Sequence, residues 1–267
     1  MNKLNLLMIL LALSAVTLAG QSGELKIATT TSTENSGLFE VLIPPFEKLT
    51  GIRIKVIAVG TGKALALGRS GDVDLVLVHA LKAEELFVEQ GYGVKRHKVM
   101  YNDFVIIGPA ADPAGIKAQK SAIRALKIIE AAESSFISRG DNSGTHKKEI
   151  ELWQQAGINP KGKWYKEAGQ GMGAVITMAD ALKAYTMTDR GTYLALQDKI
   201  EVMVLVEGDP LLFNPYGIIA VNPKKHSHVN YNGATRFIEW LTAPAGQEII
   251  GSFRKKGEIL FYPDAVE

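Results

Sequence analysis

The stretch from Ser138 to Thr145 (Ser-Arg-Gly-Asp-Asn-Ser-Gly-Thr) combines residue types that can bind an anion. It lies between an apolar run and an amphipathic run, a pattern that predicts a strand end, a polar loop and the first turn of a helix. A helix start offers backbone N–H groups without intrahelical partners and the positive end of the helix dipole. Arg139 adds a forked cation, Ser143 and Thr145 add hydroxyl donors, and Gly144 permits close approach of the backbone. These features predict an anion site.

The same residues allow a purely structural interpretation. Arg139 can pair with Asp141, and Ser143 or Thr145 can simply cap the helix. The local pattern does not decide between the two, so the elements around it have to be considered.

Two further polar loops follow predicted strands. Thr30, Thr31 and Ser32 lie where a strand over 25–31 passes into a polar loop, and Thr61 lies in a Gly-Thr-Gly turn after a strand over 53–59. A third strand, over 73–78, is mostly apolar. Helical patterns alternate with these strands, which indicates a parallel sheet with helices on its faces. Because ligands of such sheets bind at the carboxyl ends of the strands, these loops are expected to meet at one edge.

The remainder of the chain continues the alternation, with predicted strands over 104–108, 136–138, 164–167, 185–188, 202–206 and 217–221. Turn residues mark boundaries near 102–104 and 208–216. We therefore expect an α/β protein of two lobes, residues 23–103 plus 215–267 and residues 104–214. The chain crosses between them twice, and a ligand cleft lies between them.

One helix is expected to be irregular. Leu38, Leu42, Phe46 and Leu49 have near-helical spacing, but Pro44-Pro45 lies inside the run. Proline removes an amide donor and clashes with the preceding turn, so a break or kink is predicted there.

The N-terminus has the pattern of a secretory signal peptide. Lys3 precedes an apolar run over 4–16, and small residues follow at Ala19 and Gly20, so residues 1–22 are expected to be a leader. The chain of 267 residues has no cysteine, which excludes disulfides, thioester chemistry and a lipid anchor on cysteine. A formal net charge of +2 favours neither a nucleic-acid binder nor a basic membrane surface. The expected location is periplasmic or secreted.

Motifs for other chemistries are incomplete. Gly62-Lys63 is similar to a P-loop, but Ile57 replaces its first glycine and Ala64 replaces the hydroxyl residue that holds magnesium. Gly169, Gly171 and Ala174 match a dinucleotide fingerprint, yet the preceding residues 163–167 are too charged for a buried strand.

Catalytic and metal-binding patterns are also weak. The five histidines lack zinc-site spacing, so no metal site is expected, and Ser143 lacks the flanking glycines of a nucleophile elbow. His79, after the central strand, either faces the cleft or is a structural histidine.

Seven stretches together resemble the tungstate-binding component of bacterial ABC transporters. They are Thr29–Ser32, Gly60–Gly62, Met100–Phe104, Ser138–Lys148, Gly169–Gly173, Thr188–Tyr193 and Asn214–Gly217. The resemblance covers essentially the whole mature chain. Arg139 followed by Ser143-Gly144-Thr145 is also similar to periplasmic phosphate-binding proteins.

The resemblance implies a type II periplasmic binding protein, in which two lobes of mostly parallel sheet flanked by helices close on a tetrahedral oxyanion. It implies a non-enzymatic receptor that delivers tungstate to a membrane permease, with no cofactor, no nucleic-acid partner and no need to be more than a monomer. Carried over to this sequence, the oxyanion contacts are Thr30, Thr31, Ser32, Thr61, Arg139, Ser143, Gly144 and Thr145. Which of the consecutive threonines points inward stays open, because side chains alternate along a strand.

The residue chemistry narrows the ligand. Tungstate is a dianion without protons and needs only donors, whereas phosphate also carries a donor and would need a carboxylate. Asp141 is the only acid within the 138–145 stretch, where it is expected to brace Arg139, the sole obvious cation. This favours tungstate or molybdate over phosphate. The preference for tungstate rests on the resemblance alone, so a site for molybdate, phosphate or sulfate is the alternative, and an NAD-dependent dehydrogenase a remote one.

Overall fold

The computed structural model describes residues 23–141 and 143–265, so the predicted leader over residues 1–22 lies outside the described residues. The first lobe is built on β1 (Glu24–Thr30), which pairs in parallel with β2 (Arg53–Val59) on one side and β3 (Leu75–Val78) on the other. Every residue of β3 is buried, as its unbroken apolar run predicts. No helix within the described ranges is long and apolar enough to span a membrane.

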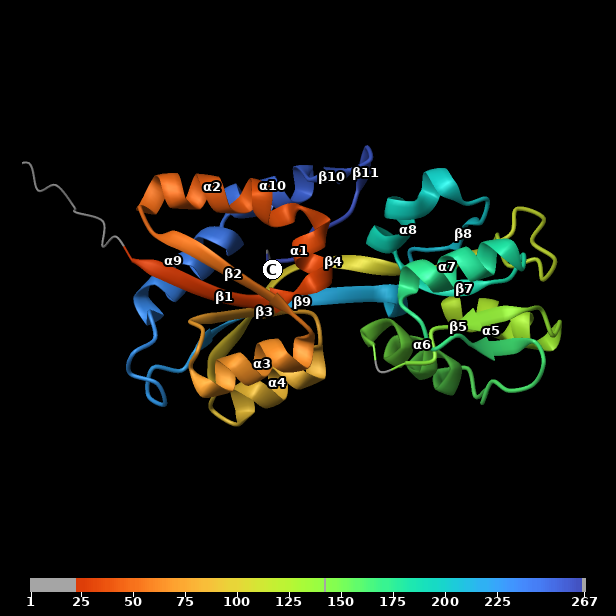
Figure 1. The fold of residues 1–267 in the computed structure, drawn as a ribbon, viewed down its shortest axis with the longest axis horizontal. Coiled ribbons are helices and arrows are strands. Elements are labelled where there is room, and N and C mark those ends of the chain that lie inside the picture. Colours follow the sequence, from red (N-terminus) through yellow and green to blue (C-terminus); the bar gives the residue numbers. More distant parts are fainter. Residues whose placement is uncertain (1–22, 142, 266–267) are drawn as a thin grey trace, which may run out of the picture.

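Two long strands connect the first lobe to the second (Figure 1). Strand β9 (Phe213–Val221) pairs antiparallel with β3, and β4 (Gly93–Gly108) pairs antiparallel with β9. The far half of β4 pairs instead with β7 (Thr186–Asp189) and β8 (Met203–Val206). The residue ranges of the two lobes stay a prediction.

Helices cover both faces of the first sheet. Figure 1 shows α2 (Leu38–Thr50) and α10 (Pro244–Ser252) on one face and α3 (Thr61–Ser70) and α4 (Leu81–Glu89) on the other. The remaining elements of this lobe are α1 (Thr31–Ser36), α9 (Tyr231–Thr242), β10 (Arg254–Lys255), β11 (Glu258–Ile259) and β12 (Tyr262–Pro263). Separate buried clusters lie on the two faces, one around Phe46 and Phe237 and the other around Phe87.

The second lobe repeats the arrangement on a smaller scale. Strand β5 (Phe136–Ser138) pairs in parallel with β6 (Tyr165–Glu167), and a parallel bridge joins Phe136 to Tyr185, just before β7. The helices of this lobe are α5 (Ala122–Ala131), α6 (Gly144–Gln155), α7 (Met172–Ala181) and α8 (Arg190–Leu196). Each strand that enters a helix therefore places that helix start at the carboxyl edge of its sheet.

Helix α2 runs through Pro44-Pro45, so the prediction of a break was wrong, while a kink at this point stays a prediction. Both prolines are exposed, whereas Leu42 and Phe46 are buried. Glu40 and Val41, whose carbonyls lose their amide partners, are exposed as well. Water can replace the missing donors, and packing of the buried stripe holds the helix together.

Gly217 of β9 lies under a buried ion pair. Arg96 Nε of β4 and Glu84 Oε2 of α4 are 2.7 Å apart, and a Cβ added at Gly217 would clash with Glu84 Oε2. We expect Gly217→Ala to lower the free energy of unfolding by about 3 kcal/mol, because the pair must move or break. Urea unfolding measures this. Gly62→Ala, where the added Cβ meets nothing within 4 Å, is the control and should not lose stability. Wild-type stability of Gly217→Ala would show that the pair yields easily.

Candidate anion-binding site

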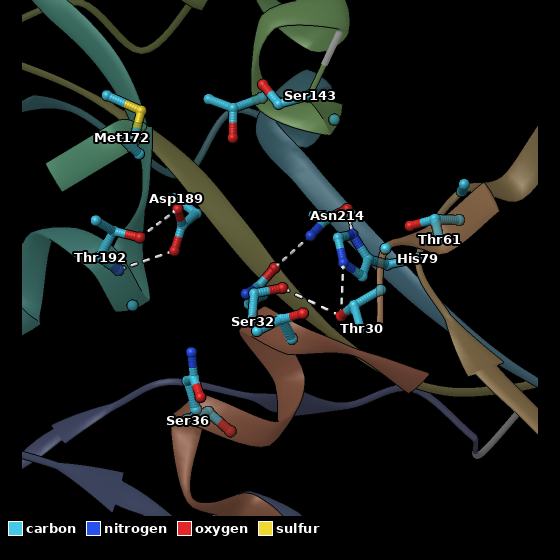
Figure 2. Close-up of a pocket in the computed structure, with 18 of the residues that line it drawn as sticks. Thr30, Ser32, Ser36, Thr61, His79, Ser143, Met172, Asp189, Thr192 and Asn214 are labelled. Atoms are coloured by element: carbon cyan, nitrogen blue, oxygen red, sulfur yellow. Dashed lines mark hydrogen bonds between the residues drawn. The ribbon is translucent and has the colours of Figure 1, made fainter. Parts of the chain in front are cut away.

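A cavity of about 890 Å³ lies between the lobes, and all eight predicted contact residues line it. Figure 2 shows Thr30, Ser32 and Thr61 from the first lobe and Ser143 from the second. The other four are Thr31, Arg139, Gly144 and Thr145. The loops at 30–32, 61 and 138–145, separated widely in sequence, are thus brought together.

Several helices begin at this cavity. Its lining includes Thr61 and Gly62 of α3, Gly144 and Thr145 of α6, and Met172 and Gly173 of α7. The first amides of a helix have no intrahelical acceptor, and each helix start carries about half a positive charge. Convergence of these starts creates a positive potential and a set of N–H donors, as an oxyanion requires.

At the start of α6, Arg139 pairs with Asp141 and Ser143 caps the helix, and both Arg139 and Ser143 also line the cavity. Arg139 Nε donates to Asp141 Oδ2 at 2.9 Å, and Ser143 Oγ caps the helix by accepting from the His146 amide at 3.1 Å. Asp141 Oδ1 also accepts from the Ser143 amide at 3.0 Å. Burial opposes ionisation of Asp141, but hydrogen bonds from Ser143 and Arg139 outweigh it and lower its pKa. Asp141 thus stays a carboxylate that braces both the loop and the arginine.

The three residues at 30–32 differ in exposure. Thr31 and Ser32 are exposed, whereas Thr30 is 4% exposed. The Thr30 hydroxyl lies 2.6 Å from Thr33 Oγ1 and 3.2 Å from His79 Nε2. Of these side chains, Thr31 and Ser32 are therefore the more available to a ligand.

The lining also contains charged residues that the sequence patterns did not single out. Lys147 of α6 and Lys255 of β10 join Arg139, so the prediction of a sole cation was wrong. Lys255 Nζ donates to the carbonyls of Asn35 and Ser36, at 3.0 and 3.1 Å. The sequence did not single out Lys147, because it belongs to a run typical of a solvated helix face, or Lys255, because it lies more than 100 residues from Arg139.

One carboxylate outside the 138–145 stretch also lines the cavity. Asp189 caps α8, where its Oδ1 accepts from the Thr192 amide at 2.8 Å and its Oδ2 from the Thr192 hydroxyl at 2.7 Å (Figure 2). Both oxygens thus have donors within the protein.

A buried carboxyl group supports the α6 loop from behind. Glu149 is 1% exposed and accepts hydrogen bonds from Ser138 Oγ at 2.9 Å, Trp153 Nε1 at 3.1 Å and Tyr165 Oη at 2.8 Å. Burial raises the pKa of Glu149 to about 7, although these hydrogen bonds favour the charged form. The group ties α6 to β5 and β6, and so fixes where the α6 start lies.

Known proteins share this architecture. Residues 15–245 match the PBP superfamily domain. The tungstate-binding protein TupA of Peptoclostridium acidaminophilum is 49% identical over 249 residues, which are 92% of this chain and 87% of that protein. The solved structure of TupA from Desulfovibrio alaskensis G20 has a TM-score of 0.87 and 49% identity, covering 91% of this chain and 100% of that one.

A second solved structure, described as the tungstate ABC transporter from Geobacter sulfurreducens, has a TM-score of 0.76 and 57% identity. It covers 86% of this chain and 98% of that one. The expected two-lobed α/β architecture is confirmed. With the superfamily domain spanning most of its length and these identities along it, the chain belongs to the PBP superfamily and, within it, to the family of the TupA tungstate-binding proteins.

Proposed function

We propose that this protein binds tungstate outside the cytoplasm and delivers it to the permease of an ABC transporter. The observation that carries the proposal is the cavity between the lobes, where the hydroxyls of both lobes, several helix starts and Arg139 converge. The relatives named above as tungstate-binding proteins support the choice of anion.

The donor set suits a fully deprotonated tetrahedral dianion. Hydroxyls of Thr31, Ser32 and Thr61 and amides at the start of α6 supply neutral donors from two sides. Arg139 supplies charge-assisted donors in a planar fork. Lys147 and Lys255 add positive potential at the cavity, which raises the association rate of an anion.

The groups that line the cavity also fit a binding role better than a catalytic one. The Ser143 hydroxyl accepts from a backbone amide as a helix cap, which is a structural task. The dinucleotide-like glycines at 169–171 follow β6, whose residues are half-buried or exposed rather than the buried first strand of a nucleotide-binding fold. We propose a non-enzymatic, monomeric receptor with no resident cofactor, since tungstate is its cargo.

A thermal-shift panel tests the proposal. Tungstate at 100 times its dissociation constant should add about 2.7 kcal/mol to folding stability and raise the melting temperature by about 5–10 °C. Sulfate and phosphate at the same concentration should give much smaller shifts. Competition of molybdate against tungstate in calorimetry then decides the alternative ligand. Absence of a shift with every oxyanion would contradict the anion site.

A further inference from the structure

A ring of interacting side chains lies beside the 30–32 loop, and Figure 2 labels Thr30, His79 and Asn214 among its members. His79 contacts two other members of this ring. Its Nε2 lies 3.2 Å from Thr30 Oγ1, and its Nδ1 lies 3.2 Å from Asn214 Oδ1. Asn214 Nδ2 donates to Asn102 Oδ1 at 2.8 Å, and Asn102 Nδ2 donates to the Tyr216 hydroxyl at 3.3 Å. Thr33 interacts with the buried Tyr216 hydroxyl, and Thr33 Oγ1 lies 2.6 Å from Thr30 Oγ1, so the interacting side chains form a ring.

The ring connects the predicted anion loop to both strands that cross between the lobes. Thr30 ends β1 and caps α1, and His79 follows β3. Asn102 of β4 and Asn214 of β9 are paired neighbours in the sheet. Both asparagines are at most 7% exposed. A displacement of the α1 start therefore acts on β4 and β9 at the point where they leave the first lobe.

The amides set the direction of the protons around the ring. Since the Asn214 nitrogen donates to Asn102, its oxygen faces His79 Nδ1, and only an Nδ1–H can pair with it. Burial lowers the pKa of His79 despite the opposing effect of the Asn214 hydrogen bond, so the imidazole is neutral. In a neutral imidazole with Nδ1–H, Nε2 is an acceptor, and the Thr30 hydroxyl is the donor that faces it.

This direction uses the whole hydrogen-bonding capacity of the Thr30 hydroxyl. Its one proton goes to His79, and its two lone pairs accept from the Thr33 amide at 3.3 Å and the Thr33 hydroxyl at 2.6 Å. No proton of Thr30 is left for an anion. The exposed Ser32 hydroxyl, 3.1 Å from Thr30 Oγ1, stands between the ring and the cavity.

We propose that His79 and Thr30 are positioning residues that hold the α1 start against the two crossing strands, while Thr31 and Ser32 donate to the oxyanion. The inference rests on the proposed function. It changes the predicted role of Thr30 from contact to support, and it gives His79 a role in binding without contact to the ligand.

Nitrogen-15 NMR of the imidazole rings tests the proton arrangement in the free protein and with tungstate. The His79 signal is assigned by its loss in His79→Gln. We expect a neutral Nδ1–H tautomer whose Nε2 accepts a hydrogen bond in both states. An Nε2–H tautomer would overturn the direction of the ring. Loss of the Nε2 hydrogen bond when tungstate is added would show that Thr30 turns to the ligand, which also overturns the proposal.

A double-mutant cycle tests the coupling. Thr30→Val and His79→Leu should each weaken tungstate binding about tenfold, the effect of losing one buried hydrogen bond. The double variant should lose about tenfold as well, because the ring is already open. Thr30→Ser keeps the hydroxyl and should bind like wild type. Additive losses would overturn the proposal, and thermal unfolding confirms that each variant is folded. Failure of the wild type to bind tungstate would instead refute the proposed function, while the NMR of the free protein still tests the ring.

Discussion

Arg139→Ala is expected to weaken tungstate binding by about 100-fold or more, as measured by titration calorimetry. Arg139 presents a guanidinium at the cavity, and Asp141 already holds that group in place through bonds of 2.9 Å from Nε and 2.8 Å from Nη2. Little side-chain entropy is therefore lost when an anion binds. Removal of the guanidinium leaves the dianion with hydroxyls, amides and the two lysines of the lining, none of which supplies a planar fork of charge-assisted donors.

Two variants sharpen the result. Arg139→Lys keeps the charge but loses the planar fork, so its affinity should fall between those of wild type and Arg139→Ala. Arg124→Ala removes the same charge from an exposed position of α5 outside the cavity lining, and it should leave the affinity unchanged at physiological salt. Wild-type affinity in Arg139→Ala would remove this residue from the site.

The second large effect is a pH dependence of stability that originates in Glu149. Its pKa is about 7 in the folded protein and 4.5 for an unperturbed glutamate, so between these pH values the folded state holds a proton that the unfolded state has released. The contribution of Glu149 to the free energy of unfolding is therefore fully present below about pH 4.5 and is lost as the pH rises through 7. The 2.5-unit difference corresponds to about 3 kcal/mol in the free energy of unfolding.

Glu149→Gln is the matched variant, because an amide resembles the protonated acid. Its oxygen can accept from Trp153 and Tyr165 as Glu149 Oε1 does, and its nitrogen can donate to Ser138 Oγ. Urea unfolding from pH 4 to 8 should show the variant gaining on wild type by about 3 kcal/mol, with the two similar at the acid end. Parallel curves for the two proteins would contradict the assignment of this titration to Glu149.

Features that depend on neighbouring residues could be predicted well. The strand, loop and helix order around Ser143, Gly144 and Thr145 follows from apolar periodicity, a capping serine and a glycine, all within one turn. The same holds for the turn before Thr61. Such patterns identify loops whose amides and hydroxyls can bind an anion, since the chemistry of a helix start is local.

Other features depend on partners far along the chain, and these were missed. Strand β4 begins at Gly93, but its first half carries Lys95, Arg96 and Lys98 without clear alternation of apolar residues. Pairing with β9 stabilises it regardless. Helix α2 likewise tolerates Pro44-Pro45 because packing outweighs local propensity.

The amino-acid sequence was sufficient to predict an anion site at the Ser138–Thr145 stretch and the alternating α/β pattern around it. Long-range packing places this stretch on the same cavity as Thr31, Ser32 and Thr61, with Lys147 and Lys255 also in the lining. It also decided that the Thr30 hydroxyl faces His79 rather than solvent. The reason is physical: capping and propensity act within a few residues, whereas the direction of a side chain in a cleft is set by long-range strand pairing and burial.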